Sequence, residues 1–345
     1  MKRILAACFM AAAIASAEDA VPVPMYRVIH FKDPSAAESP MNEAAALGYR
    51  LCLFSGSLAV MRREATPPDT YRYLLVEGDV DPGMVKHLVE GDVDWRPKRL
   101  VNSLNSAGAM GYRLDPRQSL LTRELTFVLE KEPHPRNFQY VLAGAVTMNT
   151  AWKRVWRYED EGYGLVYLAN NKGKPLAIME RELSGPQRAV APPPLPASRR
   201  FIVVDASRRE TFAEKLNATC RDGYRVLDGP FGSLSGGGQS ALVEVSEQSY
   251  EYALPGKDAS AWVQEIGGKG FHLRWDASTQ GIFEREIGSP ARFEHRLVPA
   301  SGGLETEANR VSGEGFAPVG FVYGQLVLER RVTGPGPVEG SARRP

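Results

Sequence analysis

Apolar and polar positions alternate along this chain with two periods, which predict short strands and short helices. Tyr250, Tyr252 and Leu254 stand at every second position, the spacing of a strand with one buried face. Phe212 and Leu216 stand four positions apart, the spacing of one face of a helix. Both patterns recur along the chain, so we expect a fold built from both kinds of element.

The chain contains an internal repeat that is marked by a glycine followed by an aromatic residue. A small residue precedes the glycine by three positions in five of six copies, and an asparagine precedes it by six positions in four. The pairs are Gly48-Tyr49, Gly111-Tyr112, Gly162-Tyr163, Gly223-Tyr224, Gly270-Phe271 and Gly315-Phe316. Six matches in register with their flanks indicate six diverged copies of one unit.

Each of these glycines is expected to end a helix, such as the helix predicted over residues 211–222. A glycine just past a helix end adopts the left-handed conformation, which strains any residue with a side chain. The small residue three positions earlier, Cys220 in the fourth copy, would let the last helical turn approach a sheet closely. Asparagine is a poor helix former, so its recurrence favours a structural task such as a hydrogen bond to a neighbouring strand.

Strands are predicted on both sides of each helix. The last strand of a copy carries a β-branched residue, a large apolar residue and then charges, as in Val60-Met61-Arg62. Because successive side chains point to opposite faces, Val60 and Met61 place apolar groups on both faces of that strand. One face should meet the helix and the other a neighbouring copy. The first strands are predicted at residues 26–31, 71–76, 138–142, 201–204, 250–254 and 293–298.

These elements predict an α+β fold of six diverged βαββ repeats that form two-layer α/β sandwiches. One unit of about 40 residues has too small a core to be stable alone, so the copies should pack on one another. The proline-rich residues 185–198 are expected to be a stiff linker that groups the copies three and three. Paired sheets and a closed ring are both open as the way the copies associate. The predicted repeats span 26–64, 71–132 and 138–182 within residues 24–184, then 199–248, 250–286 and 293–332 within residues 199–332.

The repeat resembles small bacterial domains of unknown function, arranged here as a tandem array. In the second copy the pattern reads Leu104-Asn105 followed by Gly111-Tyr112-Arg113-Leu114. In the bacterial domains a strand-helix-strand-strand unit carries a Leu-Asn…Gly-Trp motif. Tyrosine or phenylalanine replaces that tryptophan here, and the third copy has Trp156 in place of the asparagine. The resemblance implies a fold and carries no activity.

The N-terminal residues 1–17 are predicted to be a signal peptide that is cleaved after Ala17. A basic start is followed by the uncharged apolar run Ile4–Ile14 and by the small-x-small site Ala15-Ser16-Ala17. A lipoprotein site at Cys8 would leave too short an apolar stretch before it. We therefore expect a periplasmic or secreted protein. No later segment reaches the ~20 apolar residues of a membrane-spanning helix, and residues 333–345 are expected to be a disordered tail.

The net charge narrows the classes of partner, and the cysteine content bears on whether a disulfide forms. Loss of residues 1–17 removes two basic residues and changes the formal net charge from +1 to −1. A near-neutral chain without a basic stripe argues against nucleic acid as a partner. Cys52 and Cys220 remain, and because they lie in different elements of the first and fourth copies we favour two buried free thiols.

An acidic insertion at residues 77–98 is the only candidate metal site in the sequence. Asp79, Asp81, Asp92 and Asp94 have the Asp-x-Asp spacing that could hold calcium. The insertion lacks the glycine and the final glutamate of an EF-hand loop, so a solvated acidic loop is the favoured interpretation.

No catalytic residue or cofactor site is predicted. The histidines form no His-x-x-x-His pair and there is no Cys-x-x-Cys motif. His30 and His295 are placed at the first-strand position that Tyr73 fills in the second copy, which favours a structural role for both. The remaining histidines are His87, His134 and His272.

The function expected from these patterns is that of an exported binding or assembly module with a protein or cell-envelope partner. Repeats that keep a common core and diverge on their surfaces build extended recognition surfaces. Two alternatives stay open: an exported enzyme with its active site between copies, and calcium-linked adhesion through the insertion at residues 77–98.

Overall fold

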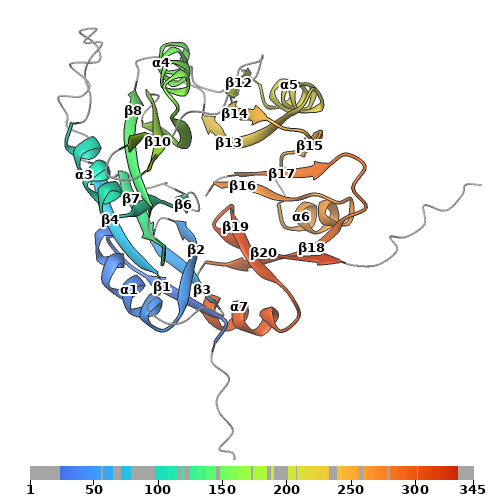
Figure 1. Ribbon diagram of the computed structural model, residues 1–345. Coiled ribbons are helices and arrows are strands. Elements are labelled where there is room, and N and C mark those ends of the chain that lie inside the picture. The colour runs from blue at the N-terminus through green and yellow to red at the C-terminus, as the bar shows by residue number, and fades with distance from the viewer. Residues whose placement is uncertain are drawn as a thin grey trace, which may run out of the picture.

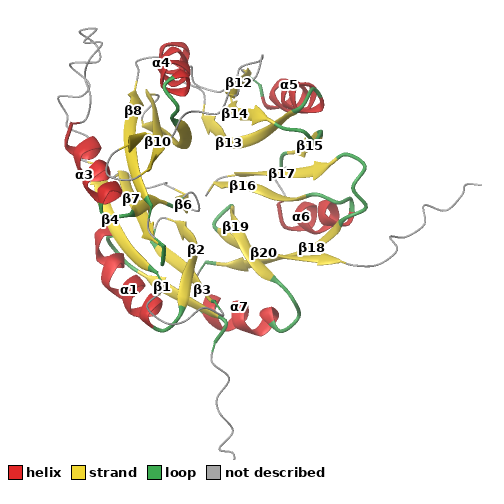
Figure 2. Cartoon of the chain, viewed as in Figure 1, coloured by secondary structure: helices red, strands yellow, loops and turns green. Residues whose placement is uncertain are grey.

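The computed structural model describes most of the chain between residues 24 and 332. Its described ranges are 24–55, 57–64, 71–78, 98–115, 118–119, 125–134, 136–144, 148–171, 174–184, 188–189, 201–206, 208–232, 239–255, 259–277, 280–300 and 302–332. Within these ranges the fold is α+β, with six helices and six small three-stranded antiparallel sheets (Figure 2). The structure therefore shows the repetition that the six glycine–aromatic pairs predict.

The first three sheets and their helices follow one another along the chain in the same order. The elements are β1 (Tyr26–His30), the 3-10 turn η1 (Pro34–Ala37), α1 (Glu38–Ala46), β2 (Tyr49–Ser55) and β3 (Leu58–Arg63); β4 (Arg72–Gly78), α3 (Lys98–Ala109), β5 (Tyr112–Leu114), β6 (Gln118–Ser119) and β7 (Leu125–Lys131); and β8 (Asn137–Gly144), α4 (Met148–Asp160), β9 (Gly164–Asn171) and β10 (Lys174–Ser184).

The second half of the chain repeats this order. Its elements are the short strand β11 (Arg188–Ala189); β12 (Phe201–Ala206), α5 (Arg209–Arg221), β13 (Tyr224–Gly232) and β14 (Gln239–Val245); β15 (Tyr250–Ala253), α6 (Ala259–Gly268), β16 (His272–Ala277) and β17 (Gln280–Glu286); and β18 (Arg292–Pro299), α7 (Leu304–Ser312), β19 (Ala317–Val322) and β20 (Gln325–Val332).

The last strand of each copy is the central strand of its sheet. In the first copy the strand order is β1-β3-β2, and the same first-third-second order holds in the other five. The central position explains the two adjacent apolar residues of this strand. In one core cluster, Met61 of β3 and Val128 of β7 both pack with Met41 of α1. The helix α1 is therefore covered on one side by its own sheet and on the other by the next sheet, as the apolar pattern predicts.

The six repeated glycines have the conformation expected of residues that end helices. Their φ angles lie between 87° and 90°. The small residue three positions earlier lies against the next sheet: a Cβ atom on Gly108 would be 2.3 Å from the carbonyl oxygen of Phe138. At this position the size of one side chain sets how closely neighbouring copies approach.

The six units form a closed ring, with strands inward and helices outward (Figure 1). The first unit and the sixth lie side by side, and Val60 of β3 shares a core cluster with Leu304 and Ala308 of α7. Neighbouring units also meet through two parallel strand pairs, one of β2 with β6, the short strand that follows β5, and one of β16 with β19. Of the two modes of association left open by the sequence, the structure has the ring.

The predicted linker falls only partly within the described residues. Its residues 188–189 form β11, which folds back on the end of β10. The first and sixth units, which a division at this linker assigns to different halves, share a core cluster. Residues 1–17 and 333–345 lie outside the described ranges, and none of the described helices is long and apolar enough to cross a membrane.

Candidate functional site

In four of the six units, the repeated asparagine joins the helix to the first strand of the next unit. Asn42 of α1 donates from Nδ2 to the carbonyl oxygen of Tyr73 (2.9 Å), and its Oδ1 accepts from the Tyr73 backbone N–H (2.9 Å). Four residues earlier, Glu38 accepts from the backbone N–H of Leu75 (2.8 Å). These side chains satisfy the free edge of β4, as an additional strand would.

The tyrosine side chain reaches back across the same contact between two neighbouring units, which we call a seam. The Tyr73 hydroxyl accepts from the backbone N–H of Leu51 (2.7 Å) in the first unit and donates to Oε2 of Glu130 (2.9 Å) in its own unit. Tyr73 is buried, and this burial together with the charge of Glu130 raises the pKa of its hydroxyl. The tyrosine therefore remains neutral and acts as a structural hydrogen-bonding group.

An arginine of the preceding unit completes the set. Arg50, two residues after Gly48, donates to Glu130 Oε1 from Nε (3.0 Å) and Nη2 (2.6 Å). We call the four residues Asn42, Tyr73, Glu130 and Arg50 the seam clasp of the first and second units. Two further clasps place the same four residue types at the same positions; they consist of Asn105, Tyr140, Glu180 and Arg113, and of Asn217, Tyr252, Glu284 and Arg225.

The buried glutamates of two clasps titrate in opposite directions. Burial raises the pKa of Glu180, and the hydrogen bond and charge of Arg113 only partly offset it. Burial also acts to raise the pKa of Glu284, but hydrogen bonds from His272 and Arg225 and the charge of Arg274 outweigh it and lower that pKa to about 2. The number of cationic side chains around each carboxylate decides whether its pKa is raised or lowered.

At two of the remaining three seams, other residues take the places of the asparagine and the tyrosine. At the seam of the fifth and sixth units, His295 replaces the tyrosine and its Nε2 lies 3.0 Å from Oε2 of Glu329, which also accepts from the Leu273 backbone N–H (3.1 Å). At the seam of the third and fourth units, Trp156 and Phe201 occupy the asparagine and tyrosine positions.

The ring is closed by the asparagine of the last helix. Asn309 Oδ1 accepts from the backbone N–H of Tyr26 (2.8 Å), and its Nδ2 donates to the Tyr26 carbonyl oxygen (2.9 Å). Glu305 accepts from the Val28 backbone N–H (2.8 Å), as Glu38 does from Leu75. The sixth helix thus holds the first strand as the first helix holds β4.

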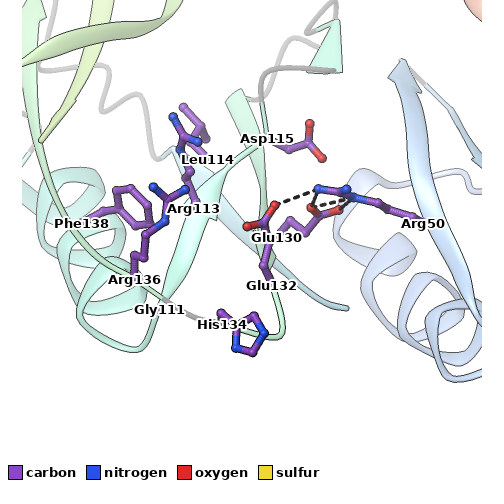
Figure 3. A pocket seen from close by; sticks show the side chains of 10 residues that line it. All are labelled: Arg50, Gly111, Arg113, Leu114, Asp115, Glu130, Glu132, His134, Arg136 and Phe138. Atoms are coloured by element: carbon purple, nitrogen blue, oxygen red, sulfur yellow. Dashed lines mark hydrogen bonds and ion pairs between the residues drawn. The ribbon is translucent and has the colours of Figure 1, made fainter. Parts of the chain in front are cut away.

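A pocket of about 210 Å³ opens where the first three units meet (Figure 3). Arg50 comes from the first unit, Arg113 from the second, and Phe138 from the first strand of the third. His134 and Arg136 lie in the connection between the second and third units. The pocket is therefore a property of the assembled ring and exists in no single unit.

Charges of both signs line this pocket. Arg113, Arg136 and Phe138 stand on one side and Arg50 on the other, with Glu130 between them (Figure 3). Glu132 accepts from Arg50 Nη2 (2.9 Å). The remaining polar residues of the lining are Asp115 and His134. Equal numbers of arginines and carboxylates make the lining polar and close to neutral.

The sequence-predicted metal ligands are not placed by the structure. Asp79, Asp81, Asp92 and Asp94 lie outside the described residues, so a calcium site at residues 77–98 stays a prediction. Elsewhere in the described part of the chain, no group of three or more histidine, cysteine, aspartate or glutamate side chains could hold a metal ion.

The predicted roles of the histidines and cysteines have mixed outcomes. His295 occupies the tyrosine position of its strand, but His30 does not: the pairing of Tyr26 with Arg62 matches that of Tyr73 with Glu130, so Tyr26 is the equivalent residue. Cys220 is a buried free thiol with a pKa that burial raises to about 12. Cys52 also forms no disulfide, but it is only half-buried, so the prediction of a buried thiol is wrong at this position.

Sequence reasoning missed the clasp arginines and glutamates and the whole pocket. The signal for the clasp was present, because Arg50, Arg113 and Arg225 each follow a glycine–tyrosine pair. Their partner carboxylates lie in the next unit, and a pattern read within one copy does not connect them. His134, which was not singled out, lines the pocket.

Comparisons of the chain with protein-family models, with curated proteins and with solved structures found no match.

Proposed function

We propose that this protein is an exported binding module that recognises its partner or ligand at the pocket between the first three units. The observation that carries this proposal is the origin of the pocket lining, in which charged side chains from three successive units converge. A site of this kind depends on the register of the ring and is absent from an isolated copy. Repeat proteins use such surfaces between units for recognition.

The same proposal includes the finer description of the fold and the compartment. We regard the chain as six βαββ units, each a sheet with one helix layered on it, and as similar to the small bacterial domains with the Leu-Asn…Gly-Trp motif. The strand-helix-strand-strand order along the chain supports this description. Export is inferred from the sequence of residues 1–17.

Affinity capture with matched variants tests the proposed function. The full mature chain, Arg136→Glu and Lys269→Glu would each be immobilised and exposed to an extract of exported proteins and envelope components from the native host. Arg136 lines the pocket and is about half exposed, whereas Lys269 follows α6 in the fifth unit and is more exposed. Both substitutions reverse one surface charge and should leave the fold intact.

The expected result is a component that the mature chain and Lys269→Glu retain and that Arg136→Glu loses. Circular dichroism and the melting temperature would confirm that both variants fold. Retention of the same components by all three proteins would contradict a recognition role for this pocket.

A further inference from the structure

Two arginines on one wall of the pocket between the first three units keep N–H groups that no described residue accepts. Arg113 donates to Glu180 through Nε (2.7 Å) and Nη2, which leaves Nη1. Arg136 donates to Glu182 through Nη1 (2.8 Å), which leaves Nε and Nη2. Both side chains are close to half exposed, so these donors can reach a ligand.

The ring of Phe138 holds both guanidinium groups on this wall. The Cζ atoms of Arg113 and Arg136 lie 5.3 Å and 5.6 Å from the centre of the ring. A cation over the face of an aromatic ring is attracted by the negative charge of that face. Two guanidinium groups held near one ring form a preorganised site for a planar anion such as a carboxylate.

A carboxylate of the same pocket offers the opposite charge. Glu132 accepts from Arg50 through Oε1 (2.9 Å), and its Oε2 has no hydrogen bond to the described residues. Its side chain is 46% exposed, so Oε2 can accept from a cationic ligand group. With Glu130 and Asp115 also in the lining, three carboxylates balance three arginines, so the lining favours a ligand that carries charges of both signs.

The size of the pocket limits the ligand further. Pockets for drug-sized ligands have about 300–1,000 Å³, whereas this one has about 210 Å³. A small molecule with one carboxylate and one cationic group fits both the volume and the balance of charges.

We propose that this pocket binds a free α-amino acid, with its carboxylate on Arg113 and Arg136 and its ammonium group on Glu132. The proposal rests on the proposed function and specifies the ligand class of the same site. The ligand side chain would lie toward the open side of the pocket. The identity of that side chain is an outcome of the test.

Isothermal titration calorimetry of the full mature chain tests this assignment. The probes are the twenty amino acids one at a time, with acetate as the carboxylate half alone and methylammonium as the cationic half alone. At least one amino acid should bind more tightly than either half. Arg136→Ala should weaken that binding about ten- to a hundredfold, because a charged hydrogen bond contributes about 1.5–3 kcal/mol and each 1.4 kcal/mol is a factor of ten.

Glu132→Gln separates an amino acid site from a simple anion site. It should weaken amino acid binding by a similar factor and leave acetate binding unchanged or stronger. Lys269→Ala, which alters a charge outside the pocket, should bind as the unaltered chain does.

Two results would overturn the proposal: no binding of any of the twenty amino acids, or acetate binding as tightly as every amino acid. Loss of affinity capture in Arg136→Glu combined with either result would leave the binding module in place and remove only the amino acid as its ligand.

Discussion

The buried Tyr73 hydroxyl, which both accepts and donates a hydrogen bond, makes its seam clasp sensitive to the loss of one oxygen atom. Tyr73→Phe leaves the Leu51 N–H without its acceptor and removes the hydrogen bond to Glu130. We expect it to lower the free energy of unfolding by about 1.5–3 kcal/mol, the range for a hydrogen bond to a charged group. Urea unfolding at neutral pH measures this change.

Tyr71→Phe is the matched control for this prediction. Tyr71 is also buried in the first strand region of the second unit, and its ring lies 4.4 Å from the Arg50 guanidinium carbon. A phenylalanine keeps that contact, so the change in unfolding free energy should stay within about 0.5 kcal/mol. Equal effects of the two substitutions would show that the Tyr73 hydroxyl has no special role.

The contributions of the two buried glutamates to the stability of the fold should change with pH in opposite directions. Glu284 has a pKa lowered to about 2, so its ionised form stabilises the fold above its usual pKa, and this contribution is lost as pH falls from about 4.5 toward 2. Glu284→Gln should therefore cost about 3–5 kcal/mol at neutral pH, because it also leaves Arg225 without its buried partner. The cost should shrink in acid.

Glu180→Gln is the comparison for Glu284→Gln. The pKa of Glu180 is raised, so its protonated form stabilises the fold at low pH, and this contribution is lost as pH rises through the folded-state pKa. Relative to the unaltered chain, Glu180→Gln should become less destabilising as pH rises. Unfolding measured across the acid range would contradict this account if both variants showed the same trend.

At the scale of the element, the close approach of each helix to the next sheet should limit which residues are tolerated. A Cβ atom on Gly108 of α3 would lie 2.3 Å from a backbone oxygen of β8, so that Gly108→Ala must displace the helix or the strand. We expect a loss of about 1–3 kcal/mol of unfolding free energy, the usual cost of overpacking. Thermal unfolding measures it.

Gly268→Ala in α6 is the control for this close approach. A Cβ atom on Gly268 would meet nothing within 4 Å, so alanine should leave the stability unchanged or raise it by up to about 1 kcal/mol through its better helix propensity. If Gly108→Ala were as well tolerated as Gly268→Ala, the small residue would not set the distance between units.

The elements themselves could be predicted from the sequence because their causes are local. The helix predicted over residues 211–222 is α5, Arg209–Arg221, and its terminal glycine has φ 90°. The clasp and the pocket could not be predicted, because Arg50 and Glu130 are 80 residues apart and meet only when two units pack. The prediction placed His30, instead of Tyr26, at the tyrosine position for a similar reason. The pairing between strands fixes the register, and the pattern within one strand does not show that pairing.

At the scale of the whole molecule, the ring depends on contacts between residues that are almost 300 positions apart. Asn309 and Glu305 of α7 accept the backbone N–H groups of Tyr26 and Val28, on the edge of β1 that faces away from β3. An open array would leave this edge exposed to water, as the outer edge of any terminal repeat is. Closure removes an edge that could otherwise pair with another chain.

Amide hydrogen exchange at Tyr26 and Val28, followed by NMR in the mature chain and in Asn309→Ala, tests the closed ring most directly. The account predicts that both amides are protected in the mature chain, and that Asn309→Ala removes the protection at Tyr26 while Tyr252, held by Asn217 in another seam, keeps its own. Fast exchange of Tyr26 and Val28 in the unaltered chain, or no effect of Asn309→Ala, would contradict closure of the ring by the sixth helix.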